Sequence, residues 1–237
     1  MDTEYPKLMD LYYSYKGDED EKFFTQIPYE LSQVPREYDE YENDLSLLDP
    51  TNYEIFKKDL LTWVGDSIKD KFKELKGFKY LKESGATNIK YLEPNNEHKM
   101  PDLLATFSEI NDTILEVKSI NNSDDDKRMW NELAKNKATA KSTIICLNAA
   151  LKQKMRDSIN TALEQLSSYP ETTVNKIILL VIALDTNNAF SEQNWIDLEN
   201  FLKEIARNQS SVKMVWYYHR FGKDIRNELG LTGFLTL

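Results

Sequence analysis

The sequence from Met100 to Ile120, MPDLLATFSEINDTILEVKSI, contains two short runs of mostly aliphatic residues on either side of a polar segment at 108–113. Aliphatic runs that flank an Asn-Asp pair, here Asn111-Asp112, are typical of a β-hairpin. Pro101-Asp102 opens the first run, and Glu116-Val117-Lys118 lies inside the second. The hairpin is the part of the chain from which both the fold and the chemistry can be predicted.

Side chains alternate along a strand, so Glu116 and Lys118 share one face of the second run. The opposite face carries Leu115, Val117 and Ser119. Burying a carboxylate and an ammonium group on a hydrophobic strand costs free energy, so their presence indicates a function that outweighs this cost. If the register of the hairpin brings Asp102 to the same face, two carboxylates and a lysine converge. The alternative is an ordinary strand whose Glu116 and Lys118 form a cross-strand pair on a solvated face.

Two carboxylates and one lysine suit phosphodiester chemistry. Carboxylate oxygens are the ligands that Mg²⁺ prefers, and they leave coordination positions for water and a phosphate. A bound metal ion can activate a water molecule, and a lysine can orient that water or stabilise the charge that develops on the phosphate.

The pattern of Pro101-Asp102 followed 14 residues later by Glu116-Val117-Lys118 resembles the PD-(D/E)XK nuclease superfamily. The resemblance implies that Asp102 and Glu116 bind a metal ion, with the carbonyl of Val117 as a third ligand. It also implies that Lys118 is the catalytic lysine and that the cofactor is Mg²⁺ or Mn²⁺.

The order of elements along the chain predicts an α/β domain with a central mixed sheet flanked by helices. This order matches the αβββαβ core of restriction-endonuclease-like proteins, with the motif on its second and third strands. We expect strands at 87–92, 176–184 and 212–218 in addition to the hairpin. The segment 142–147 is either a short strand or the start of the next helix. We expect helices at 51–84 (one long helix or two abutting ones), 127–139, 151–169 and 191–207.

Three further residues are site candidates by resemblance. Gln165 and Tyr169 resemble the QxxxY motif that some branches of the superfamily carry, where these residues line the site and help to place the nucleic acid. Because they are four residues apart, we expect them to share a face of the helix at 151–169. Glu74 has suitable spacing for the glutamate that the family often places on its first helix facing the metal ions, and Asp70 is the alternative.

Composition limits the alternatives. The first 50 residues hold 14 of the 40 acidic residues but only 4 of the 30 basic ones, which accounts for the whole net charge of −10. The neutral remainder is compatible with a nucleic-acid substrate. A single cysteine and two histidines make a zinc site or a histidine-based triad improbable. The absence of a long apolar run and of a signal-peptide pattern favours a cytoplasmic protein.

The acidic segment 1–50 also holds seven of the 13 tyrosines, and we interpret it as an N-terminal extension of a nuclease-like domain at 51–237. The extension is either draped on the domain, a docking or regulatory segment, or an element that gates the active site. Nine lysines between residues 57 and 90 form either a phosphate-facing surface or a solvated helix face. Arg128 and Trp130 are candidates for substrate contact, with packing as the alternative.

These observations predict a metal-dependent nuclease, with DNA favoured over RNA and endonucleolytic cleavage favoured over exonucleolytic cleavage. A role in restriction, phage defence or mobile-element processing is the expected setting, and a homodimer or a partner bound through the N-terminal segment is possible. The rival hypothesis is a non-catalytic binding or regulatory protein, in which the acidic segment docks a partner or mimics DNA.

Overall fold

The computed structural model describes residues 4–17, 22–33, 35–63, 67–92, 100–107, 112–121, 147–170, 174–183, 191–220 and 223–229. The chain divides into two compact units, Met1–Thr113 and Ile114–Leu237, which are described separately below. Composition alone had suggested a division after residue 50. The expected helix at 127–139, the segment 142–146, and Arg128 and Trp130 lie outside the described residues.

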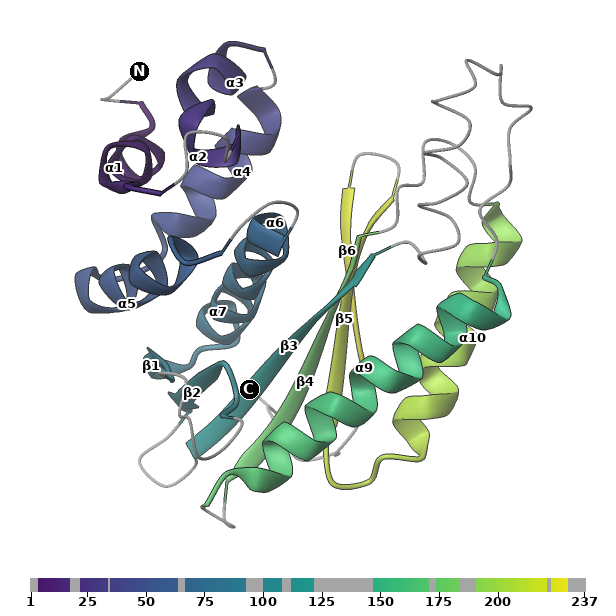
Figure 1. Cartoon of the computed structure of the whole chain (residues 1–237). Helices are drawn as coiled ribbons and strands as arrows, with labels where there is room; N and C mark the ends of the chain where they lie inside the picture. The colour runs from purple at the N-terminus through teal and green to yellow at the C-terminus, as the bar shows by residue number, and fades with distance from the viewer. Residues whose placement is uncertain are drawn as a thin grey trace. The chain divides into compact units, whose positions relative to one another are not determined.

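The chain has an α/β fold with a mixed, open sheet, as the order of elements predicts (Figure 1). The described strands follow one another in the sheet in sequence order. β1 pairs with β2 and β5 with β6 in antiparallel fashion, whereas β4 and β5 are parallel. The strands are β1 (Thr87–Tyr91), β2 (Leu103–Thr106), β3 (Asp112–Asn121), β4 (Asn175–Ala183), β5 (Lys213–Arg220) and β6 (Lys223–Leu229).

Helices dominate the first unit. The described residues of the expected helix at 51–84 form three helices, and those of 1–49, for which no regular period was found, form four. The helices are α1 (Pro6–Ser14), α2 (Lys22–Thr25), α3 (Ile27–Gln33), α4 (Pro35–Leu45), α5 (Pro50–Leu60), α6 (Ser67–Phe72) and α7 (Glu74–Glu83). Pro6, Pro35 and Pro50 each stand at the first helical position, where proline is favourable because its missing N–H is not needed.

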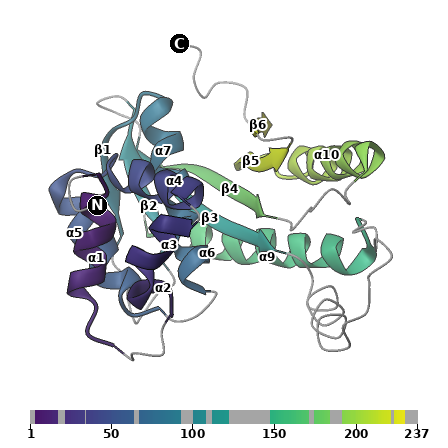
Figure 2. The same ribbon diagram turned by 90° about the horizontal axis from the view of Figure 1, so that it is seen from above.

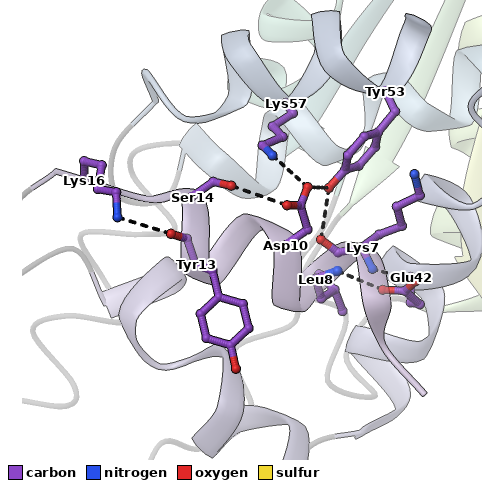
Figure 3. A network of polar contacts seen from close by, with 9 residues as sticks. All are labelled: Lys7, Leu8, Asp10, Tyr13, Ser14, Lys16, Glu42, Tyr53 and Lys57. Atoms are coloured by element: carbon purple, nitrogen blue, oxygen red, sulfur yellow. Dashed lines mark hydrogen bonds and ion pairs between the residues drawn. The ribbon is translucent and has the colours of Figure 1, made fainter. Parts of the chain in front are cut away.

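The N-terminal helices are held to α5 by a network of polar contacts (Figure 3). Asp10 of α1 accepts hydrogen bonds from the Tyr53 hydroxyl and from Lys57 Nζ, each at 2.7 Å. Burial alone would raise the pKa of Asp10, but these hydrogen bonds outweigh it and lower the pKa. Glu42 of α4 accepts from the backbone N–H groups of Lys7 and Leu8, at 3.1 and 2.9 Å. A buried carboxylate from α4 thus caps the first turn of α1.

The strands of the first unit have a local irregularity. The register of β1 with β2 shifts between Thr87 and Lys90, where Asn88 has φ of 50°. Asparagine tolerates this left-handed conformation better than most residues. Beyond the shift, Tyr91 pairs with Leu103, and the Leu92 N–H donates to the carbonyl of Asp102 at 3.0 Å. Asp102 therefore lies beside the end of β1.

The second unit matches its predicted elements closely. The run at 176–184 forms β4, which is buried along most of its length as expected for a central strand. Asn148 and Ser191 cap the helices α9 (Ala149–Ser168) and α10 (Glu192–Arg207). α9 packs along β4, and α10 contacts β6 (Figure 2). The final strand β6 had not been predicted. In the described part of the chain no helix is both long enough and apolar enough to cross a membrane.

Candidate functional site

The second unit holds a buried ion pair on β3. Every residue of β3 from Thr113 to Val117 is buried, and the Glu116 side chain is only 1% exposed. Lys118 Nζ lies 2.5 Å from Glu116 Oε1. Glu116 does not lie on a solvated strand face, because the side chains on both faces of β3 are buried at this point. The pair forms within one strand rather than across two.

Gln165 of α9 holds the same lysine. Its Oε1 atom accepts a hydrogen bond from Lys118 Nζ at 2.6 Å. The core face of α9 carries Leu151, Met155, Ile159, Ala162 and Leu166, so that Gln165 is half-buried at the border of this face. Gln165 was predicted as a site residue, and the structure brings it to Lys118 from 47 residues away.

Tyr169 departs from the expected helical geometry. α9 ends at Ser168, and Tyr169 follows with an extended backbone at φ −65° and ψ 127°. The cause is Pro170, since a residue before proline is disfavoured in the helical region. Tyr169 thus follows directly after the last helical residue, and its side chain is half-buried.

The first unit holds a pair of interacting carboxylates, Glu74 and Asp102. Glu74 is the first residue of α7, and its side chain is 13% exposed. Burial and the negative charge of Asp102 raise the pKa of Glu74 to about 8. Asp70, the alternative candidate, pairs instead with Lys73 Nζ at 2.8 Å on the same stretch of chain. Of these contacts, the interaction of Glu74 with Asp102 agrees with the predicted pairing of a glutamate on this segment with the Asp102 site.

Lys71 connects Glu74 to Asp59 and had not been singled out from the sequence. Its Nζ atom lies 2.5 Å from Glu74 Oε2 and 2.5 Å from Asp59 Oδ2, and its side chain is 8% exposed. We had grouped Lys71 with the other lysines of 57–90 as a surface residue. Its position could have been found, because Lys71 falls on the apolar face that Ile68, Phe72 and Leu75 define.

Most of the other lysines considered for phosphate binding have partners inside the first unit. Lys57 pairs with Asp10, and Lys76 pairs with Asp44 at 2.9 Å and with Glu40. Lys82 donates to the carbonyl of Leu47 at 3.1 Å. These contacts join α5 and α7 to the acidic N-terminal helices. Acidic residues of the N-terminal segment therefore neutralise lysines such as Lys57 and Lys76.

The chemistry of Glu74 and Asp102 suits a hard divalent cation. Lys71 pairs with Asp59 and Glu74, and the charge of Asp102 raises the pKa of Glu74, so that a bound cation would favour the ionised form of Glu74. Within the described residues, no group of three or more His, Cys, Asp or Glu side chains could by itself hold a metal ion. Glu116, the other predicted carboxylate ligand, belongs to the second unit, as does the backbone of Val117.

No protein-family model matches the chain, and no curated protein is detectably similar to it in sequence. The residues themselves therefore carry the evidence on function.

Proposed function

We propose that this protein is a divalent-metal-dependent nuclease with a restriction-endonuclease-like core, acting on DNA in preference to RNA. The observation that supports this best is the Glu116–Lys118 pair, whose carboxylate is almost completely buried at the centre of β3. A carboxylate is costly to bury even beside a partly exposed lysine, because the loss of its hydration can exceed the attraction of its partner. A catalytic use explains why β3 carries these two residues.

In this proposal Asp102 and Glu116 hold the metal ion, with the Val117 carbonyl and Glu74 as further ligands. When bound, Mg²⁺ or Mn²⁺ would supply the positive charge that acidifies a water molecule and neutralises the phosphate. The proposal assigns the metal ion to Asp102 and Glu116 together. Asp102 and Glu116 must therefore both be needed for metal binding and for cleavage.

Lys118 orients the attacking water, and Gln165 orients Lys118. An ammonium group has three N–H donors. Glu116 and Gln165 accept two of them, and they fix the direction of the third. That donor can bind the attacking water or an oxygen of the scissile phosphate. Tyr169, directly after α9, is proposed to contact the nucleic-acid backbone.

The rival binding-protein hypothesis is less well supported. It needs the acidic residues of the N-terminal segment to face a partner. Asp10, Glu40 and Asp44 instead pair with lysines of the first unit. We retain a homodimer in the cytoplasm as the setting of the proposed nuclease.

The test is cleavage of DNA in Mg²⁺ or Mn²⁺ by the wild type, Asp102→Asn and Glu116→Gln. Both variants keep the shape of the side chain and remove its charge. We expect each to lose cleavage and the metal-dependent rise in melting temperature while melting cooperatively in chelator. Cleavage at the wild-type rate in both variants would show that these carboxylates are not the ligands.

A further inference from the structure

Tyr91 ends in a buried hydroxyl group that no described residue satisfies. The residue is 7% exposed, and its Oη atom has no hydrogen-bond partner within the described part of the chain. Buried hydroxyl groups are normally hydrogen-bonded, because leaving one unpaired costs its full desolvation free energy. Such an atom in a folded protein calls for a ligand or an ordered water molecule as its missing partner.

The aromatic residues that pack against Tyr91 lie close to Glu74 and Lys71. Its ring stacks on Phe78 at 6.1 Å and 12°, and lies 5.5 Å from Phe56. Glu74 stands one helical turn before Phe78 on the same face of α7. Lys71 Nζ, which binds Glu74, lies 5.7 Å from the ring centroid of Phe56. The Tyr91 ring is therefore packed among residues that surround Glu74.

The backbone brings Asp102 to the same place. Tyr91 pairs with Leu103, the residue directly after Asp102. The side chain of Asn52 fixes the Tyr91 backbone, whose N–H donates to Asn52 Oδ1 at 3.0 Å. Burial raises the pKa of Tyr91 well above its usual value, and the charges of Glu74 and Asp102 raise it further. The Tyr91 phenol is therefore close enough to Glu74 and Asp102 to interact electrostatically with both carboxylates.

We propose that the Tyr91 hydroxyl is an outer-sphere partner of a hydrated divalent cation bound by Glu74 and Asp102. Mg²⁺ usually keeps several of its waters when it binds to protein carboxylates. Those waters need acceptors for their protons, and Tyr91 Oη has unused acceptor positions. Tyr91 is in this sense a positioning residue, since it holds a metal-bound water and does not touch the metal ion. The inference rests on the proposed function, which makes these two carboxylates ligands.

The experiment compares Tyr91→Phe with Tyr53→Phe, each in the full chain. The control is matched because Tyr53 is also buried, but its hydroxyl is satisfied by Asp10 at 2.7 Å and by the Lys7 carbonyl at 3.1 Å. Melting temperatures are measured in chelator and during titration with Mg²⁺ alone. In chelator we expect Tyr91→Phe to melt at or above the wild-type temperature and Tyr53→Phe to melt below it.

During the titration we expect the Mg²⁺ concentration at half of the melting-temperature rise to increase about 10-fold in Tyr91→Phe. The same midpoint should be unchanged in Tyr53→Phe. An unchanged midpoint in Tyr91→Phe overturns the inference, and so does a loss of melting temperature in chelator as large as that of Tyr53→Phe.

The two proposals fail in different ways. DNA cleavage by the wild type together with an unchanged Tyr91→Phe midpoint overturns the inference about Tyr91 alone. A wild-type Mg²⁺ response without cleavage under any metal condition overturns the proposed nuclease activity alone. A wild type whose melting temperature does not respond to Mg²⁺ overturns both.

Discussion

Lys118 Nζ lies 2.5 Å from Glu116 Oε1 and thereby joins an ammonium group to an almost fully buried carboxylate on the same strand. The same nitrogen donates to Gln165 at 2.6 Å. Two acceptors from β3 and α9 therefore hold one flexible side chain. Hydrogen bonds to two acceptors hold the Lys118 ammonium group in one position. A group that positions a water molecule for reaction needs such a fixed geometry.

Gln165→Ala should slow cleavage without removing the fold. The variant deletes one of the two acceptors of Lys118, and a misplaced catalytic group costs roughly 10- to 100-fold in rate. The measurement is the initial rate of plasmid cleavage at saturating Mg²⁺. Gln153→Ala is the matched control, because Gln153 lies on the exposed side of α9 and its side-chain amide donates to Asp157, four residues away. Equal rates in the two variants would remove Gln165 from the mechanism.

Glu42→Ala should destabilise the protein by about 2 kcal/mol, because two backbone N–H groups of α1 lose a charged acceptor. Urea unfolding at neutral pH measures the change. Asn43→Ala, at the exposed neighbouring position, should change the free energy of unfolding by less than about 0.5 kcal/mol. A small effect at Glu42 would mean that the α1–α4 contact is dispensable.

Removal of residues 1–48 should unfold the first unit rather than raise the proposed nuclease activity. Leu8, Leu11, Phe24, Ile27 and Leu45 are fully buried, and the removed helices pair with lysines of α5 and α7. We expect the truncated chain to lose its cooperative melting transition, as measured by circular dichroism. A truncated protein that melts like the full chain and cleaves faster would instead establish the segment as a gate.

Asp49→Ala should cost about 1 kcal/mol, since Asp49 caps α5 and accepts from the N–H groups of Thr51 and Asn52. Asp49→Asn should cost little, because asparagine caps as well. Hydrogen bonds from Asn52 and Thr51 lower the pKa of Asp49. The ionised form is therefore favoured in the folded state, and its contribution is present above about pH 4 and lost as the pH falls through the lowered value.

Urea unfolding at pH 7 and pH 3 tests the sign of this pH dependence. The difference in free energy of unfolding between wild type and Asp49→Ala should shrink at pH 3. A difference that grows towards low pH would contradict the role of the carboxylate as the acceptor.

Apart from β6, the described strands and helices of the second unit could be predicted because each has a simple pattern. β4 is a continuous run of aliphatic residues, and α10 has a capping serine followed by apolar residues at helical spacing. The strand with Glu116 and Lys118 was also predicted. The break after Ser168 could have been foreseen from Pro170, which restricts Tyr169.

The first unit was harder to predict because its stability depends on long-range polar contacts. Four short helices with many acidic residues have no clear apolar period, and their partners are lysines up to 47 residues away. Three prolines of this unit, Pro6, Pro35 and Pro50, begin helices. Lys71 and Tyr91 were missed for a related reason, since a single charged or aromatic residue in an apolar pattern does not show which groups will surround it.

The most direct test of the nuclease account is cleavage of plasmid and single-stranded DNA in Mg²⁺ or Mn²⁺ by the wild type beside Lys118→Ala. We predict metal-dependent cleavage by the wild type and a loss of about 10²- to 10⁴-fold in the variant, with its melting transition retained. Cleavage by Lys118→Ala at the wild-type rate, or no cleavage by a folded wild-type protein under either metal, would contradict the account.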